Sequence, residues 1–410
     1  QTIYFFDNVY WSTWEKYNKP VSTDLSIQSL IENDEYIIEY IKGYKISNYN
    51  IYSDIFNDYF ATYIAMICRR TKREIIQNPL ELRNIFNIHY RFIEKYLINN
   101  SIKYLIMPPS FSGGFDFLIA IISKKLGIKT IFIESFHCRK FFYSTDWLDW
   151  GYFKQSKKIF NKIEAFIYEK DPTKLFYINQ YEKSFNKSKG LKYKILFYFQ
   201  SINLIVSTFI FSFFSKKILM KSFFETSGKL FSKASKVKFF LNQSKNINHE
   251  IENLNLDYVY FPLSYQPEAT TLSYGDEYDD QLLAIEKIDK IIPKNWKILV
   301  KEHPYQIDQF YRGNLFYERI KLIKSVIMIP VKKFENEDLI KKSKFVSTVS
   351  GNTGWESIRM LKQVLLFGRP WYLSLPGVVN INEFKNLDDF LALSWDLKDI
   401  KYKIEDLSQK

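Results

Sequence analysis

The sequence has few of the residues that would mark a redox, metal-binding or dinucleotide-binding protein. Its two cysteines, Cys68 and Cys138, lie far apart and form neither a disulfide spacing nor a metal-ligand spacing, which fits a reducing compartment. A G-x-G-x-x-G motif is absent, so we do not expect a dinucleotide cofactor. No convincing Asp-x-Asp pair is present either, and we expect neither a metal nor any other cofactor.

The N-terminus also lacks a recognisable signal peptide. Residues 3–6 are predicted to form a short strand followed by Asp7, without the charged region and long apolar core of a secretory signal. We therefore expect a cytoplasmic protein. The 410 residues, of which 46% are hydrophobic and 25% charged, have a globular composition, and their number predicts two domains rather than one core.

Nearly all of the excess positive charge lies in one segment. Residues 183–245 contain thirteen lysines, no arginine and one acidic residue, Glu225, so this segment carries +12 of the chain's net charge of +13. Within it, residues 195–215 are uncharged and rich in Phe, Ile and Leu. Basic charge that is lysine only and confined to an apolar segment argues against a nucleic-acid-binding protein, because base recognition relies on arginine.

Three interpretations of residues 195–215 compete. Their length suits a transmembrane helix, but polar residues occupy about half of the helical wheel and lysines flank both ends. A helix packed on protein between two domains, with a solvated lysine face, is the second interpretation. The pattern favours the third, in which residues 186–245 dock on an anionic membrane surface, at the inner face of a bacterial inner membrane.

Both halves of the chain alternate between strand-like and helical stretches. In the N-terminal half, residues 104–107 and 130–134 are predicted strands on either side of a helix that ends near Lys125. In the C-terminal half we expect strands at residues 258–263, 297–301, 326–329, 345–349 and 364–367. The helices expected between them span residues 280–292, 306–320, 335–342 and 355–361.

This alternation predicts an α/β protein with two doubly wound, Rossmann-type domains that face a cleft. We place the N-terminal domain at residues 1–185 and the C-terminal domain at residues 251–385. A basic apolar linker, or membrane-docking segment, occupies residues 186–250, and a helical tail occupies residues 386–410.

Two short blocks follow strands of the C-terminal half and have the composition of an anion-binding site. The first is Lys301-Glu302-His303-Pro304, and the second is STVSGNTGWE at residues 347–356, just before a helix. Strand ends of a parallel sheet meet at one edge, and a Ser/Gly/Thr loop before a helix presents N–H groups to an anion. We therefore expect the blocks to hold one phosphate together. Singly, they also fit a loop histidine and a helix N-cap.

With residues 260–271, YFPLSYQPEATT, these blocks resemble bacterial surface-polysaccharide glycosyltransferases of the GT-B kind. The similarity is to CMP-dependent transferases of capsule Kdo and of sialic acids, which have a His-Pro motif and a Ser-Ser/Thr motif. It covers these blocks in the C-terminal half. The resemblance implies a GT-B-like fold, a donor site in the C-terminal domain and an acceptor site in the N-terminal domain.

The resemblance also implies which residues bind the donor nucleotide. A departing CMP develops charge on one phosphate, which an imidazole, hydroxyls and a helix N-terminus would stabilise. Glu356 is spaced to reach the ribose hydroxyls. The expected donor-binding residues are Gln266, Lys301, His303, Pro304, Ser347, Thr348, Ser350, Gly351, Asn352, Thr353 and Glu356.

The expected catalytic residues are Glu268, His303 and Asp116. Glu268 follows the strand at residues 258–263 and is a candidate nucleophile or base, although the Kdo transferases have an Asp where this chain has Thr270. A base for the acceptor hydroxyl is expected at Asp116 or His137. The expected acceptor-binding residues are Ser112, Gly113, Gly114 and His137.

A second acidic group occupies residues 276–280. It resembles faintly the acidic motif of sialyltransferases, and an acidic first turn before the following helix explains it better.

The leading hypothesis is a transferase that moves an ulosonic acid (Kdo, sialic acid or a pseudaminic or legionaminic type) from its CMP donor to a capsule or lipopolysaccharide glycan. A CDP-polyol transferase, or a UDP- or GDP-hexose transferase of the same fold, is the alternative among enzymes. A non-catalytic protein of capsule assembly or export is the alternative of another class. The expected partners are the CMP-sugar, a glycan or glycolipid acceptor and an anionic membrane surface.

Overall fold

The computed structural model describes residues 3–5, 34–70, 79–111, 113–135, 141–153, 255–304, 306, 312–331 and 334–408. The predicted linker at residues 186–250, with its apolar stretch, lies outside this part of the chain, as do Ser112 and His137. The described residues form two sheets, one in each half of the sequence.

The N-terminal sheet has four strands, in the order β1-β2-β3-β4. The first three pair in parallel, and β4 is antiparallel to β3. The strands are β1 (Ile3–Phe5), β2 (Tyr104–Met107), β3 (Lys129–Ser135) and β4 (Phe141–Ser144). The helices of this half are α3 (Asp34–Ile41), α4 (Tyr49–Arg70), α5 (Pro79–Asn99), α6 (Gly114–Lys125) and the short 3₁₀ helix η2 (Trp147–Asp149).

Helix α6 is the centre of the N-terminal half because its sequence, GFDFLIAIISKK, is apolar on almost every side. It is buried from Phe117 to Ser123 and packs against α4 and α5. A helix that is hydrophobic all round is stable only in the interior of a protein. The βαβ unit predicted around residues 104–134 is therefore present, as β2, α6 and β3.

The C-terminal sheet has six parallel strands in the order β10-β9-β8-β5-β6-β7. This is the doubly wound order in which the chain builds outward from β5 to β7 and then returns to continue from β8. Ligands of such sheets bind where the order reverses, which here lies between β5 and β8. The strands are β5 (Tyr258–Pro262), β6 (Lys297–Lys301), β7 (Val326–Ile329), β8 (Phe345–Thr348), β9 (Val364–Leu366) and β10 (Val378–Asn380).

Helices cover both faces of the C-terminal sheet. Val259 and Phe261 of β5 pack with α11 (Gln281–Ile291) and α13 (Asn314–Lys321) on one face. Tyr258 and Tyr260 point to the other face, where α14 (Asn336–Lys342) lies, and α15 (Asn352–Arg359) packs against β8 and β9. The remaining helices of this half are α10 (Ala269–Tyr274), η3 (Asp276–Asp279), α16 (Leu387–Leu391) and α17 (Leu397–Ser408).

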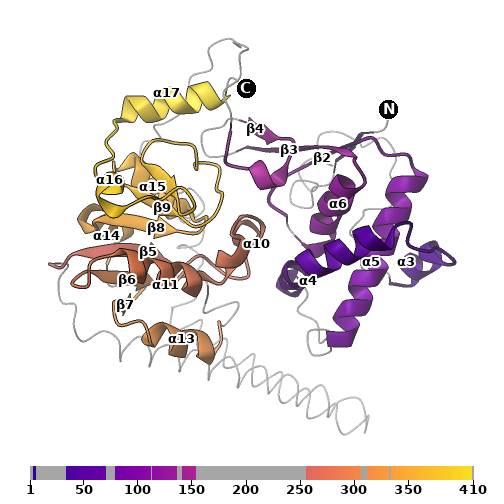
Figure 1. The fold of residues 1–410 in the computed structure, drawn as a ribbon, viewed down its shortest axis with the longest axis horizontal. Coiled ribbons are helices and arrows are strands. Elements are labelled where there is room, and N and C mark those ends of the chain that lie inside the picture. Colours follow the sequence, from indigo (N-terminus) through magenta and orange to yellow (C-terminus); the bar gives the residue numbers. More distant parts are fainter. Residues whose placement is uncertain are drawn as a thin grey trace, which may run out of the picture.

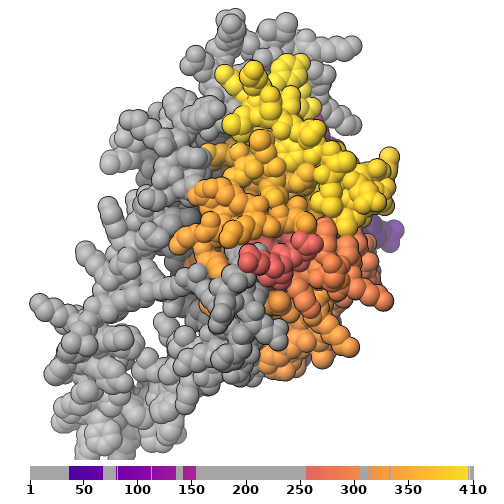
Figure 2. Space-filling view, turned by 90° about the vertical axis from the view of Figure 1, so that its left-hand side faces the viewer, coloured from indigo at the N-terminus to yellow at the C-terminus, as the bar shows by residue number. Residues whose placement is uncertain are grey.

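Of the three hydrophobic clusters formed by the described residues, one contains side chains of both halves. Figure 1 shows α10 on the side of the C-terminal half that faces the N-terminal half. The backbone N–H of Phe111, after β2, donates to the hydroxyl of Ser273 in α10 at 3.2 Å, and the rings of Trp150 and Tyr274 stack. Helix α17 also contacts β4. From the side, the C-terminal half forms a continuous surface from the orange strands and helices to the yellow C-terminal helices (Figure 2).

The predicted α/β class is confirmed, with a parallel C-terminal sheet and an N-terminal sheet that is parallel except for β4, and five predicted C-terminal strands lie where they were expected. Two strands, β4 and β10, were not predicted. The helix expected at residues 306–320 is interrupted: Gln306 is helical, Arg312 and Gly313 are not, and α13 begins at Asn314. Double winding is seen in the C-terminal sheet, whereas the described N-terminal strands follow chain order. The exact domain boundaries stay predictions.

Candidate functional site

Three polar residues lie at one level across the carboxyl edge of the C-terminal sheet. Strand β5 pairs with β8 so that Val259 lies opposite Phe345, and the same offset brings Ser264 level with Ser350. Strand β5 pairs with β6 so that Pro262 lies opposite Lys301, and that offset brings Ser264 level with His303. The order across the edge is therefore Ser350, Ser264, His303, with the switch point between the two serines.

The two serine hydroxyls are buried without a hydrogen-bond partner. Ser264 and Ser350 are each 7% exposed, and within the described part of the chain neither Oγ atom has a hydrogen bond. A buried hydroxyl left unsatisfied costs about 1–3 kcal/mol. Two such groups on neighbouring strands, at the switch point of the sheet, are therefore best explained as ligand-binding groups.

Gly351 brings the N-terminus of α15 against these hydroxyls. A Cβ atom built on Gly351 would lie 3.5 Å from Ser264 Oγ and 2.9 Å from Thr348 Oγ1, so the backbone here approaches closer than a side chain would allow. Gly351 is the N-cap residue of α15 and supplies no side-chain cap. The first N–H groups of a helix are unpaired within the helix and carry its positive dipole end. The predicted anion site thus has a helix N-terminus and two buried hydroxyls.

His303 supplies a neutral imidazole at the other side of Ser264. Burial lowers the pKa of His303 to about 4; the nearby Glu302 carboxylate opposes this shift with a smaller effect, and the Arg312 guanidinium adds to it. The side chain is half-buried, and its ring lies 5.6 Å from that of Tyr265, centroid to centroid. At neutral pH the imidazole has one N–H to donate to an anion and no charge of its own.

Lys301 and Glu356 form a second polar pair on the α14 and α15 face of the sheet. Burial lowers the pKa of Lys301 to about 8, and its Nζ donates to Phe334 O at 2.9 Å and Asn336 Oδ1 at 2.8 Å. Burial raises the pKa of Glu356 to about 7, against smaller opposite effects of Arg359 and Lys301. No hydrogen bond to the Glu356 carboxylate is present among the described residues. This carboxylate is therefore open to a ligand that donates hydroxyl groups.

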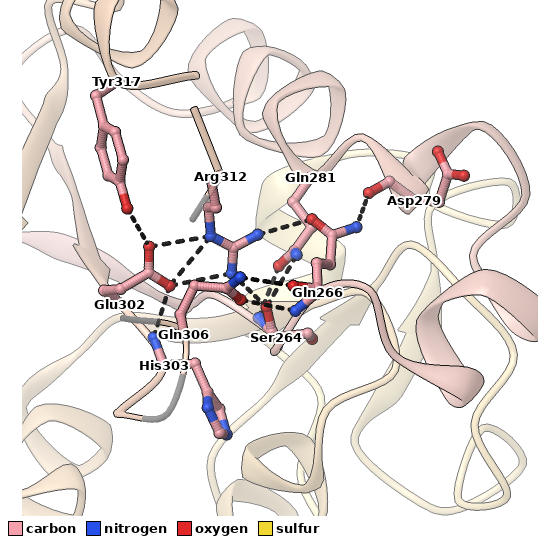
Figure 3. A network of polar contacts seen from close by, with 9 residues as sticks. All are labelled: Ser264, Gln266, Asp279, Gln281, Glu302, His303, Gln306, Arg312 and Tyr317. Carbon is pink, nitrogen blue, oxygen red and sulfur yellow. Dashed lines mark hydrogen bonds and ion pairs between the residues drawn. The ribbon is translucent and has the colours of Figure 1, made fainter. Parts of the chain in front are cut away.

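A buried hydrogen-bond network centred on Arg312 lies beside Ser264 and His303 (Figure 3). The guanidinium donates to Glu302, to Gln266 Oε1 at 2.7 Å and to the carbonyl of Ser264. The side chains of Arg312 and Glu302 are 3% and 1% exposed. Gln266 was an expected donor-binding residue. Its side-chain oxygen accepts from Arg312, and its side-chain amide donates to the carbonyl of Asp279. Figure 3 shows the His303 imidazole pointing away from this network.

Several other expected donor-binding residues have local structural partners. The Ser347 hydroxyl donates to Leu365 O at 2.8 Å, and Thr348 Oγ1 accepts from the N–H of Gly351 at 3.2 Å. The carbonyl of Thr353 accepts from Ser357 at 2.7 Å. Asn352 begins α15, and Pro304 is exposed at the end of the His-Pro turn. Ser347 and Thr348 thus shape the loop that presents Ser350 and Gly351.

The predicted catalytic Glu268 is the N-cap residue of α10, directly after the loop that follows β5. Its carboxylate accepts from the hydroxyl of Thr271 at 3.3 Å. The acidic group at residues 276–280 has structural roles, as the better explanation predicted. Asp276 forms an ion pair with Arg369, and Asp280 caps α11 through the N–H of Leu282. The role of Glu268 as nucleophile or base stays a prediction.

The expected acceptor residues of the N-terminal half lie at the start of α6. Asp116 accepts from the N–H of Gly113 at 2.8 Å and from that of Phe117 at 3.1 Å, so it closes the first turn of its own helix. A Cβ on Gly114 would lie 2.7 Å from Ile67 and 2.8 Å from Tyr63, so this glycine permits close packing of α6 on α4. Both residues thus have a structural explanation, and their acceptor roles stay predictions.

Sequence reasoning missed Ser264, Arg312 and Gln281. Ser264 was detectable, because it is the second residue after β5 just as His303 and Ser350 are the second residues after β6 and β8. Gln281 pairs twice with the backbone of Ser264, accepting from its N–H at 2.7 Å and donating to its carbonyl at 3.1 Å. The partners of Arg312 and Gln281 lie far away in sequence, and no local pattern signals them.

The described residues contain no group of three or more His, Cys, Asp or Glu side chains that could hold a metal ion. In the same part of the chain, no helix has both the length and the apolar sequence needed to cross a bilayer. The expectations on cofactors and membrane docking stay predictions.

Comparisons with known proteins give only distant structural similarity. No protein-family profile matches the chain, and no curated protein matches its sequence. A solved structure of the Thermosulfurimonas dismutans KpsC β-Kdo 2,4-transferase is 17% identical over 42% of this chain and 63% of that one, with a TM-score of 0.26. The chain thus spans less than two thirds of that protein.

Two further structures cover more of the chain. The T. dismutans KpsC β-Kdo 2,7-transferase is 11% identical over 76% of this chain and 78% of that one, with a TM-score of 0.31. A UDP-GlcNAc 2-epimerase of Methanocaldococcus jannaschii is 13% identical over 80% and 81%, with a TM-score of 0.27. At these TM-scores the similarities carry no argument about substrate or mechanism.

Proposed function

We propose that the protein is a glycosyltransferase whose C-terminal half binds a nucleotide-activated sugar through one phosphate. The observation that carries this proposal is the pair of buried, unpartnered hydroxyls of Ser264 and Ser350 at the switch point of the sheet. With the N-terminus of α15 and the imidazole of His303, they offer several hydrogen-bond donors to a group rich in acceptors. A phosphate is such a group.

A CMP-sugar is the donor that this arrangement fits best. CMP leaves with one phosphate, so a compact set of donors suffices, whereas a pyrophosphate needs a longer clamp or a metal. The resemblance of the His-Pro and Ser-rich blocks to CMP-dependent transferases supports the same choice. Because His303 is neutral at pH 7, it stabilises the leaving phosphate as a hydrogen-bond donor that strengthens as charge develops.

Glu356 is proposed to bind the ribose of the nucleotide. The Glu356 carboxylate is partly buried and has no hydrogen bond among the described residues, and a vicinal diol would offer it two donors. We expect Glu356→Gln to weaken CMP binding more than it weakens deoxy-CMP binding, so that the preference for the ribonucleotide falls. Calorimetric titration of both nucleotides measures this preference. An unchanged preference would remove Glu356 from the site.

The transfer step requires a group near the anomeric carbon. An acceptor hydroxyl oxygen bonds to that carbon, the bond from the carbon to the phosphate oxygen breaks, and CMP leaves with the electron pair. The hydroxyl proton passes to a base. Glu268, which follows the same strand as Ser264, is our candidate for this base or for a nucleophile that forms a transient sugar ester. The acceptor is proposed to bind at the N-terminal half, near the start of α6.

The setting proposed for this reaction is the inner face of a bacterial membrane, where capsule and lipopolysaccharide glycans are extended. The lysine-rich segment at residues 186–245 would attract anionic headgroups, at roughly 1 kcal/mol for each lysine close to the surface. Co-sedimentation with anionic and neutral vesicles tests this part of the proposal by itself.

A panel of nucleotides in a thermal-shift assay tests the donor. We expect CMP and CTP to raise Tm more than UDP or GDP does, since binding to the folded state alone stabilises it. Selective stabilisation by UDP or GDP would favour a hexose transferase. CDP as the best ligand would favour a CDP-polyol transferase.

If no nucleotide binds, the protein is not a nucleotide-dependent enzyme and an assembly or export role replaces the proposal. Transfer activity of His303→Ala within a few-fold of the wild type would also contradict it.

A further inference from the structure

The side chain of Arg312 is 3% exposed, and four of the five N–H donors of its guanidinium have partners among the described residues. Nε donates to Glu302 at 3.0 Å, Nη1 to Gln266 at 2.7 Å, and Nη2 to the Ser264 carbonyl and to Glu302. Its plane is also covered by Phe316, 5.1 Å from the ring centroid. An arginine bound in this way is not available as a phosphate ligand, so its function is the placement of its partners.

One of those partners, Ser264, belongs to the candidate anion site, and a second, Glu302, directly precedes His303. The carbonyl of Ser264 is held by Arg312 and Gln281, and the N–H of Ser264 is held by Gln281. Every backbone polar group of Ser264 is therefore fixed by a side chain, while its hydroxyl is left buried and unpaired. These bonds fix the backbone of Ser264 and with it the direction of the Cα–Cβ bond from which the hydroxyl extends.

The other partner leads to His303. The Glu302 carboxylate accepts from Arg312, from the hydroxyl of Tyr317 at 2.9 Å and from the backbone N–H of His303 at 2.8 Å. One guanidinium thus joins the loop after β5, which carries Ser264, to the loop after β6, which carries His303. Figure 3 shows this bridge, with the imidazole on the side away from Arg312.

We propose that Arg312 is a positioning residue that sets the spacing between the Ser264 hydroxyl and the His303 imidazole. This inference rests on the proposed function, because both groups are taken as phosphate ligands there. The local chain supports the geometry: Gly313 follows with φ +88°, a left-handed conformation that turns the chain directly from Arg312 into α13.

The test compares the wild type with Arg312→Lys, which keeps a positive charge beside Glu302 but loses the planar fork. The probe is CMP, titrated calorimetrically into the full chain. The second readout is the imidazole signal of His303 in NMR spectra of the ligand-free protein. This signal can be identified among four histidines by its absence in His303→Ala.

We expect Arg312→Lys to weaken CMP binding at least about tenfold and to move the His303 signal. The double variant Glu302→Leu with Arg312→Met removes both buried charges, so no unpaired charge is left to prevent folding. It should show the same two effects. The control is Glu94→Gln, which weakens a buried carboxylate network in the N-terminal half. It should lower Tm without changing either readout.

The outcomes separate this inference from the proposed function. If the wild type binds CMP and both Arg312 variants bind it within twofold of the wild type, the positioning role is overturned. If the wild type binds no CMP, the proposed function fails, and the NMR signal of His303 then tests the positioning role by itself. A signal that moves in Arg312→Lys but not in Glu94→Gln supports that role. A signal that does not move in Arg312→Lys overturns it. Movement in Glu94→Gln as well would reduce the effect to general loss of structure and also overturn the inference.

Discussion

Two buried polar clusters of this protein differ in how completely their groups are satisfied. In the N-terminal half, Glu94 is fully buried and accepts from the hydroxyls of Tyr44 and Ser47 at 3.0 and 2.7 Å and from the N–H of Ser47 at 3.1 Å. At the edge of the C-terminal sheet, the hydroxyls of Ser264 and Ser350 are almost as deeply buried and have no partner among the described residues.

The difference separates structural polar groups from ligand-binding ones. The Glu94 carboxylate fastens the turn before α4 to α5, and the protein itself supplies every donor it needs. Burial of the two serine hydroxyls costs desolvation free energy that no hydrogen bond among the described residues offsets. A bound ligand would supply those hydrogen bonds. Both kinds of group occur at Ser264: its backbone is held by the hydrogen-bond network of Arg312, and its hydroxyl has no partner among the described residues.

The largest effect is expected at the satisfied cluster. Glu94→Ala removes the shared acceptor of the Tyr44, Ser47 and Tyr90 hydroxyls and of the Ser47 N–H, so we expect the free energy of unfolding to fall by roughly 3 kcal/mol or more. CMP affinity should stay within twofold. Urea unfolding and calorimetric titration check the two values. A loss of CMP binding in a folded Glu94→Ala protein would erase the distinction between the clusters.

Glu356 allows a pH-dependent test of the candidate site in the C-terminal half. Burial raises its pKa in the folded protein to about 7 from an ordinary value of 4.5, so its contribution to stability is fully present below pH 4.5 and is lost as pH rises through 7. Glu356→Gln should therefore be more stable than the wild type at pH 8, by roughly 2–3 kcal/mol, and equally stable near pH 4.5. Urea unfolding across this range checks the sign, and the opposite sign would mean that the carboxylate is satisfied when charged.

Ser347 and Ser350 allow the same comparison between two buried serines, one with a hydrogen-bond partner and one without a partner among the described residues. It lies three residues before Ser350 and is fully buried, but its hydroxyl donates to Leu365 O. We expect Ser347→Ala to lower the free energy of unfolding by about 1 kcal/mol, as the loss of one hydrogen bond does, and to leave CMP affinity unchanged. Reduced CMP affinity in this variant would show that burial at the edge, rather than an open hydroxyl, determines binding.

The parts of the fold that follow from local sequence were predictable. The apolar β-branched runs of β5 to β9 gave their positions within about two residues, as is usual for element boundaries. Strands β4 and β10, with four and three residues, were not predicted, although β7 and β9 are equally short. Helix α15 begins at Asn352, earlier than the expected start at residue 355, because the N-cap is Gly351 rather than a residue with a capping side chain.

The candidate site was predictable in its outline and not in its connections. His303, Ser350 and Gly351 follow strands directly, and the parallel sheet brings them to one edge. The contact from Arg312 to Ser264 spans 48 residues, and the two contacts from Gln281 to Ser264 span 17. Such long-range pairs depend on the packing of helices on the sheet, and a single sequence contains no local signal for them. Structural roles of Asp116 and Gly114 were likewise visible only in three dimensions.

The most direct test of the account measures stability and CMP affinity together in Ser264→Ala, Ser350→Ala and the double variant, with Ser347→Ala as the matched control. Removal of each unpartnered hydroxyl should raise the free energy of unfolding of the ligand-free protein by about 1 kcal/mol or more. It should also weaken CMP binding at least about tenfold. Variants that are less stable than the wild type and bind CMP unchanged would contradict the central claim that these two hydroxyls are kept for a ligand.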